Sequence, residues 1–170
     1  MPALSSAAWV VHDVGLAAAI GGTLFGRTAL EPALHEITNP RERDLVSADA
    51  WNRFSWVKLA SHAAFAVPWF IGRTMRTGAE VSAEARALTR AKDVLVGVSL
   101  VTGIASHVLG RKLGDQIEEG QQKSRKLERT VGVLGSINAL VNTGILGITA
   151  LLAMQGSQSL RFAKSSRKLP

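Results

Sequence analysis

The sequence has no cysteine and few charged residues. The absence of cysteine excludes disulfides, thiolate metal sites and cysteine nucleophiles. Charged residues make up 19% of the 170 residues, apolar residues make up 46%, and the mean hydropathy is +0.15. A chain this apolar is not disordered. Because this hydropathy is high for a soluble domain, the positions of the apolar residues decide whether the chain folds in water or in a membrane.

Motifs of the common enzyme classes are also missing. The chain contains no Gly-rich phosphate loop after a strand, no HExxH zinc motif and no GxSxG nucleophile elbow. We therefore expect no catalytic residue and no metal site. The formal net charge is +7, but no aromatic platform or groove-reading motif accompanies the basic residues, so nucleic acid is not an expected partner.

Four apolar segments are long enough to cross a bilayer, and they cover approximately 8–30, 54–74, 93–111 and 130–155. The last is the clearest, since residues 130–160 include no ionisable side chain. A helix that is apolar on all sides belongs in lipid or deep in a large protein. A chain of 170 residues is too short to bury four such helices, which favours a membrane protein over the alternative of a soluble helical domain.

The predicted fold is all-α: an integral membrane four-helix bundle, up-down-up-down, with helical extensions outside the bilayer. Asn39 followed by Pro40 predicts a helix start, Ser82 predicts another, and Gly120 predicts a helix end. The basic segment 157–170 is predicted to be a flexible C-terminal tail. The whole chain, 1–170, is one membrane domain.

Tryptophan positions agree with this topology, whereas basic residues leave its orientation nearly tied. Trp9 and Trp69 fall on the face that holds both termini, and Trp51 and Trp56 fall on the opposite face, as in an interfacial aromatic belt. The terminal face collects nine Lys and Arg residues and the other face eleven. We predict a bacterial inner (cell) membrane with both termini in the cytoplasm.

Small residues recur four apart along the predicted spans, a spacing that lets helix backbones approach closely in lipid. They are Ala18, Gly22 and Gly26 in the first span, Ser99 and Gly103 in the third, and Gly132, Ser136, Thr143 and Gly147 in the fourth. This pattern predicts close packing within or between chains and reports no function.

Polar residues inside the spans are the candidate functional residues, because each is costly in hydrocarbon. Helical rise places His62, His107, Asn138 and Asn142 in the half of the bundle away from the termini, with Arg27, Glu31 and Lys58 near its mouth. His62 and His107 are candidate axial ligands of haem b. Alternatively, Asn138, Asn142, Lys58 and Arg27 form a polar pocket for a lipid headgroup or quinone. In the third alternative, His62 and the asparagines only join helices by hydrogen bonds and His107 faces headgroups.

At the other end, His12 and the adjacent Asp13 point in different directions on a helix, so they form no dyad. We expect Asp13 to pair with Arg73 or Arg76.

The function that these observations favour is a non-catalytic accessory, assembly or structural subunit of a membrane complex. Its expected partners are the lipid bilayer and other membrane subunits or a second copy of itself. One alternative is a bundle that binds haem or a small ligand through His62 and His107. Another alternative is a homo-oligomeric transporter of small solutes.

Overall fold

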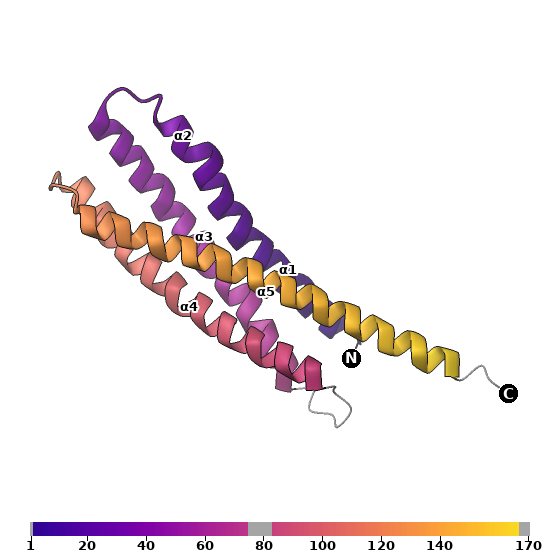
Figure 1. Cartoon of the computed structure of the whole chain (residues 1–170). Coiled ribbons are helices and arrows are strands. Elements are labelled where there is room, and N and C mark those ends of the chain that lie inside the picture. Colours follow the sequence, from indigo (N-terminus) through magenta and orange to yellow (C-terminus); the bar gives the residue numbers. More distant parts are fainter. Residues whose placement is uncertain (1, 75–82, 167–170) are drawn as a thin grey trace.

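All regular structure in the described residues is helical. The computed structural model describes residues 2–74 and 83–166, with side chains described for 6–72 and 83–154. The elements are α1 (Pro2–Phe25), the π-helical turn η1 (Gly26–Leu30), α2 (Glu31–Leu34), α3 (Pro40–Thr74), α4 (Ala83–Glu118) and α5 (Arg125–Ser166). The four long helices α1, α3, α4 and α5 alternate in direction (Figure 1). We call the end with the connections 35–39 and 119–124 the loop end, and the opposite end the terminal end.

Local capping signals set the helix boundaries at the loop end, as the sequence predicts. The Asn39 side chain accepts hydrogen bonds from the backbone N–H groups of Arg41 and Glu42 and caps α3. Gly120 has a φ of 71° and ends α4. Its N–H donates to Ile117 and the N–H of Gln121 donates to Gln116, which is the pattern of a Schellman motif. Ser82, the other predicted cap, lies outside the described residues.

Helix α1 packs along α3, and α4 packs along α5, with further contacts between α3 and α4 and between α1 and α5. Glycines on α1 permit the first contact. A Cβ on Gly15 would lie 2.8 Å from the Ser61 carbonyl oxygen, and Cβ atoms on Gly22 and Gly26 would collide with the rings of Phe54 and Trp51. Gly22 and Gly26 therefore pack against α3 within one chain, where they make room for aromatic rings, whereas the two backbones approach closely at Gly15.

The small residues of α5 behave differently. A Cβ added to Gly132 or Gly147 would have no neighbouring atom within 4 Å, so no described residue of another helix packs against the Cα of these glycines on that side. On α4, by contrast, Gly103 is needed because a Cβ there would lie 2.6 Å from His62 Nε2.

Three helical segments are long and apolar enough to cross a membrane: Ser6–Leu34, Ala83–Glu118 and Arg125–Met154. The predicted second span, 54–74, is not among them. It lies in α3, where Lys58, His62 and Pro68 interrupt the apolar sequence. The protein is thus all-helical in its described part, with three candidate membrane-spanning helices.

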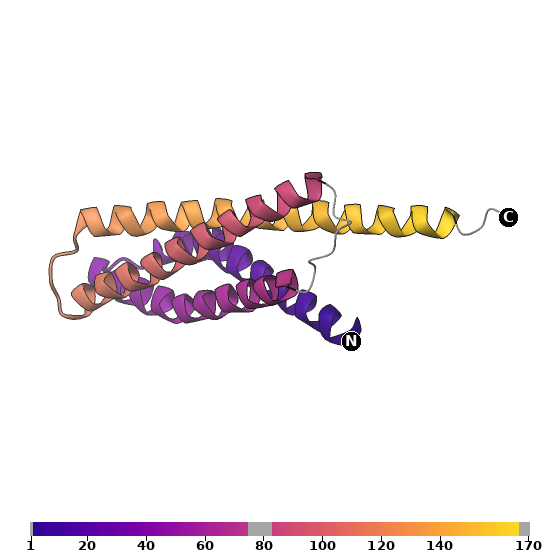
Figure 2. The same cartoon turned by 90° about the horizontal axis from the view of Figure 1, so that it is seen from below.

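Helix α5 extends beyond the other long helices at the terminal end (Figures 1 and 2). It continues to Ser166, whereas the sequence predicted a flexible tail from residue 157. The segment from 157 to 166 contains neither glycine nor proline, so nothing in its composition interrupts the helix. Residues 167–170 lie outside the described residues.

Candidate functional site

Polar side chains lie inside the protein and large apolar side chains lie on its surface. The buried polar residues are His12, Thr23, Ser61, His62, Lys92, Ser99, Asn138 and Asn142. Every long helix exposes large apolar side chains, for example Val14 (62% exposed), Val67 (54%), Val101 (69%) and Leu140 (74%). This distribution is the reverse of the one in a soluble protein.

A pocket of about 300 Å³ lies at the loop end. Residues of α1, η1, α2, α3, α4 and α5 line it. This volume is at the lower end of the range of small-molecule sites. Its charged lining residues are Arg27, Glu31, Asp44, Lys58, Arg111, Lys123 and Glu128, and its larger apolar ones are Trp51, Phe54, Leu113, Ile117 and Val131. The pocket therefore combines several cations with an apolar wall.

The π-helical turn η1 places Arg27 at the pocket. Arg27 Nη2 donates to Ser136 Oγ at 2.8 Å and to the Gly132 carbonyl at 3.3 Å, so the guanidinium is fixed against α5. Single π-helical turns often occur at functional sites. The turn begins at Gly26, where the absence of a side chain admits the Trp51 ring. Sequence reasoning did not predict this turn, since it depends on contacts between helices.

Lys58 is the second cation of the pocket, and its side chain is half-buried. Among the described residues, its ammonium has no ion-pair partner. The Arg27 charge, which has the same sign, acts on it electrostatically. Glu31 lines the same pocket but forms no ion pair with either cation in the described part of the chain.

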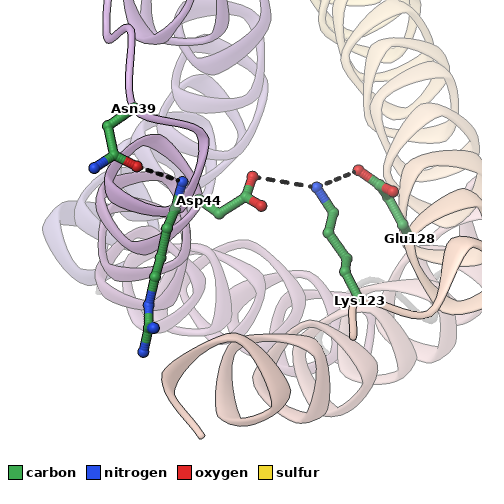
Figure 3. Close-up of polar contacts among 5 residues, drawn as sticks. Asn39, Asp44, Lys123 and Glu128 are labelled. Carbon is green, nitrogen blue, oxygen red and sulfur yellow. Dashed lines mark hydrogen bonds and ion pairs between the residues drawn. The ribbon is translucent and has the colours of Figure 1, made fainter. Parts of the chain in front are cut away.

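Two of the three pocket acids are already paired with Lys123. The Lys123 ammonium lies 2.8 Å from Glu128 of α5 and 3.5 Å from Asp44 of α3, and so joins the two helices across the pocket (Figure 3). Partial burial lowers the pKa of Lys123, but the hydrogen bond to Glu128 and the charge of Asp44 outweigh it, so the pKa is above its ordinary value. Lys123 therefore offsets one of the two negative charges of Asp44 and Glu128, and the charged lining as a whole, with four cations and three acids, carries a formal net charge of +1.

His107 also lines the pocket. Its Nδ1 lies 3.0 Å from Ser55 Oγ, and its ring meets Trp56 edge-on at 5.0 Å. Because the Ser55 hydroxyl donates to the Asn52 carbonyl, Ser55 Oγ is the acceptor and His107 Nδ1 the donor. The Arg111 guanidinium lies over the Trp56 ring, 6.0 Å from the ring centroid.

Below the pocket, His62, Asn138 and Asn142 form one buried hydrogen-bond network with Ser99. His62 Nδ1 donates to the Lys58 carbonyl at 2.6 Å, and Asn138 Nδ2 donates to His62 Nε2 at 3.2 Å and to the Ser99 carbonyl at 2.9 Å. Asn142 Nδ2 donates to Asn138 Oδ1, and the Ser99 hydroxyl donates to Asn142 Oδ1. The network connects α3, α4 and α5.

The six predicted site residues thus separate into two groups. Arg27, Lys58 and His107 line the pocket, whereas His62, Asn138 and Asn142 lie in the buried network outside its lining. Their roles in binding remain predictions.

The geometry does not fit a haem held between His62 and His107. Both ring nitrogens of His62 already form hydrogen bonds within the protein: Nδ1 donates to the Lys58 carbonyl and Nε2 accepts from Asn138. The backbone of Gly103 packs against Nε2. A porphyrin would need that space. His107 directs Nδ1 to Ser55 in a different environment.

A second buried polar site, at Lys92 near the terminal end, escaped the sequence analysis. Lys92 is 0% exposed, and its ammonium lies 2.9 Å from His12 Nε2 and 2.6 Å from Thr149 Oγ1. The ring centroid of Trp69 lies 4.0 Å from the same ammonium. Lys92 directly precedes the predicted span 93–111, where a lysine is typical of a span boundary, but its side chain points into the protein.

Trp69 consequently does not belong to an aromatic belt. Trp9 and Trp69 do lie together, with ring centroids 6.1 Å apart, but Trp69 is only 4% exposed. Its Nε1 donates to Asp93 at 3.0 Å while its face covers Lys92. The predicted pairing of Asp13 concerns Arg73 and Arg76, whose side chains lie outside the described residues.

Where side chains are described, no group of three or more His, Asp or Glu residues is arranged to hold a metal ion. No protein-family model, no curated protein and no solved structure matches this chain.

Proposed function

We propose that this protein is an integral membrane four-helix bundle that binds a small anionic amphiphile in its loop-end pocket. The observation that carries the binding proposal is the pair of cations Arg27 and Lys58. Both line one pocket, and the half-buried Lys58 ammonium has no anionic partner among the described residues. A cation withdrawn from water in this way is stabilised by a bound anion.

The membrane part of the proposal rests on the distribution of side chains. Helix α3 follows the same rule as the three candidate spans, because its polar Lys58 and His62 face inward and its outer surface is apolar. The exposed large apolar residues of its second half are Trp56, Val57, Val67, Phe70 and Ile71. Such a surface is stable against lipid and would cause aggregation in water.

Single-cysteine labelling tests insertion without background, since the chain has no cysteine of its own. We expect Val67→Cys and Leu140→Cys, at exposed apolar positions, to resist a water-soluble maleimide in intact membranes. Glu36→Cys, in the turn after α2, is expected to react. Rapid labelling of Val67→Cys in folded, membrane-associated protein would contradict a fourth span.

The same experiment tests the orientation. We propose a bacterial cell membrane with both termini in the cytoplasm, which places Glu36 outside. In intact cells an impermeant maleimide then labels Glu36→Cys. Labelling only after the cells are opened would reverse the orientation.

The ligand class follows from the lining of the pocket. Arg27 and Lys58 suit a phosphate or carboxylate group, and Trp51 and Phe54 offer an apolar surface for the part attached to it. An acidic lipid headgroup and a soluble amphiphilic anion share this chemistry.

Calorimetric titration in a zwitterionic detergent tests the binding. The probes are short-chain phosphatidic acid, the matched phosphatidylcholine and a short-chain fatty acid. We expect the two anions to bind and the zwitterion not to bind. Lys58→Met should weaken anion binding about tenfold, the equivalent of about 1.4 kcal/mol. Lys112→Met removes an exposed cation that is not in the pocket lining and should leave binding unchanged.

A role as an accessory subunit is a second candidate, and the projection of α5 favours it. Because α5 continues to Ser166 beyond the other long helices, it offers a helix for a partner subunit to pack against (Figure 2). Truncation after Met154 should then release a copurifying membrane subunit while leaving the protein folded. If no subunit copurifies with the full chain, this candidate fails.

A further inference from the structure

The interior of the protein is built in layers, and each long helix contributes one residue to each of the first two. Toward the terminal end lies a polar layer, which consists of His12, Trp69, Lys92 and Thr149. Next comes an apolar layer of Leu16, Phe65, Val96 and Ile145, all 0% exposed. Beyond it lies the hydrogen-bond network of His62, Ser99, Asn138 and Asn142, and then the loop-end pocket.

We propose that this axis is a proton pathway, with Lys92 as its proton-carrying residue and the apolar layer as its closed gate. The proposal rests on the membrane insertion proposed above and does not depend on the ligand of the pocket. Ionisable residues inside a membrane span are rare, and substrate or ion paths and proton relays are among the functions that they mark. Apolar constrictions that exclude water are an established type of gate.

Among the residues whose side chains are described, the apolar layer separates the Lys92 layer from the hydrogen-bond network. Lys92 and Ser99 are seven residues apart on α4, which corresponds to about 10.5 Å along a helix axis. Only Val96 of this helix's buried side chains lies between them. Ile145 occupies the same position on α5, between Asn142 and Thr149. A short file of water through this layer would join the two polar regions.

The charged and polar neighbours of Lys92 hold it in position. His12 Nδ1 donates to the Phe65 carbonyl at 2.5 Å, which leaves Nε2 as the acceptor for Lys92. Thr149 Oγ1 accepts a second Lys92 hydrogen, while the Thr149 hydroxyl donates to Ile145. On α1, Asp13 acts electrostatically on His12. On α4, Asp93 accepts the hydrogen bond from Trp69 of α3.

One transfer cycle moves one proton and no electrons. A Lys92 Nζ–H bond breaks as its proton passes to a water molecule in the apolar layer. This water becomes hydronium, and Lys92 becomes a neutral amine. The amine keeps its hydrogen bonds to His12 and Thr149. A hydronium from the terminal end then gives its proton to the Nζ lone pair and restores the ammonium. His12 is a positioning residue in this cycle.

Proteoliposomes that contain a pH-sensitive dye test the pathway under a potassium diffusion potential. Flotation with the vesicles and resistance to alkaline carbonate first establish insertion. Failure at this stage would contradict membrane insertion, whereas inserted protein without proton flux would contradict the pathway alone. We expect wild-type vesicles to carry a slow proton flux above that of protein-free vesicles.

Two matched substitutions on α4 test the gate. Val96→Ser places a hydroxyl in the apolar layer and should raise the flux about tenfold, the equivalent of a barrier about 1.4 kcal/mol lower. Val101→Ser makes the same change at a position that is 69% exposed and should leave the flux unchanged. Equal fluxes for Val96→Ser, Val101→Ser and wild type would overturn the proposal.

The carrier is tested by Lys92→Met, which should reduce the flux of the Val96→Ser protein to that of protein-free vesicles. If Lys92→Met does not fold, as judged by circular dichroism, Thr149→Val removes one positioning contact in its place and should lower the flux severalfold. Release of an entrapped anionic dye serves as the leak control. Proton flux accompanied by release of the dye would show an unspecific defect and overturn the pathway.

Discussion

The Lys92 ammonium lies 2.9 Å from His12 Nε2, and both side chains are fully buried between four helices. The two residues are 80 positions apart in the sequence. Their contact ties α1 to α4, two helices that otherwise meet mainly through α3 and α5.

This contact predicts a strong coupling between the two residues. His12→Leu leaves the buried ammonium without one of its acceptors and should lower the free energy of unfolding by about 2–3 kcal/mol, as for hydrogen bonds to charged groups. Adding Lys92→Met removes the buried ammonium that has lost its His12 acceptor, so the double variant should be more stable than His12→Leu alone. Thermal unfolding in detergent measures both. Strictly additive effects would show that the two side chains do not interact.

Glycine substitutions on two helices should have opposite effects. Gly15→Ala brings a Cβ within 2.8 Å of the Ser61 carbonyl oxygen, so α1 and α3 must separate. We expect a loss of about 1–3 kcal/mol, as in other overpacked sites. Gly147→Ala meets no neighbouring atom within 4 Å and should be neutral or add up to about 1 kcal/mol of helix stability. Equal melting temperatures of the two variants would contradict the packing of α1 on α3.

The buried network predicts that Asn138 matters more than an exposed neighbour. Asn138→Leu removes hydrogen bonds to His62, Ser99 and Asn142 and should cost about 0.6–1.7 kcal/mol, the range measured for such bonds within membranes. Leu140→Ala, at a position that is 74% exposed, should change the unfolding free energy less. Unfolding in mixed micelles gives the comparison, and the reverse order would rule out this role for the network.

Lys123 predicts a pH dependence at the loop end. Its pKa is raised in the folded state, so its ion pairs stabilise the fold at neutral pH, and this contribution is lost as the pH rises through the raised pKa. The contribution is small, about 0.5 kcal/mol, because the side chain is partly exposed. The difference in melting temperature between wild type and Lys123→Gln should therefore shrink above pH 10.5, the ordinary lysine value. A difference that persists at high pH would contradict the ion pairs.

Local signals in the sequence predict the helices well because they act within one turn. Asn39 marks the start of α3 and Gly120 marks the end of α4, each through hydrogen bonds to residues a few positions away. Counting the helical rise also places His62 and Asn138 in the same half of the bundle, and in the structure a hydrogen bond joins them. These inferences need only the geometry of a regular helix.

The remaining features depend on how each helix is rotated about its axis. Lys92 follows a charged segment and precedes an apolar run, and nothing in that order shows that its side chain points inward. Rotation also decides that Asn138 and Asn142 lie in the network and outside the pocket lining. The π-helical turn at Arg27 depends on Trp51 of another helix and has no local signal.

The most direct test of the binding claim is native mass spectrometry of the protein released from mild detergent after mixing with equal amounts of an acidic and a zwitterionic lipid. We expect wild type and Lys112→Met to retain one acidic lipid per chain and Lys58→Met to lose it. Equal retention of acidic lipid by wild type and Lys58→Met, or no preference for acidic over zwitterionic lipid, would contradict a pocket that binds anions through Lys58 and Arg27.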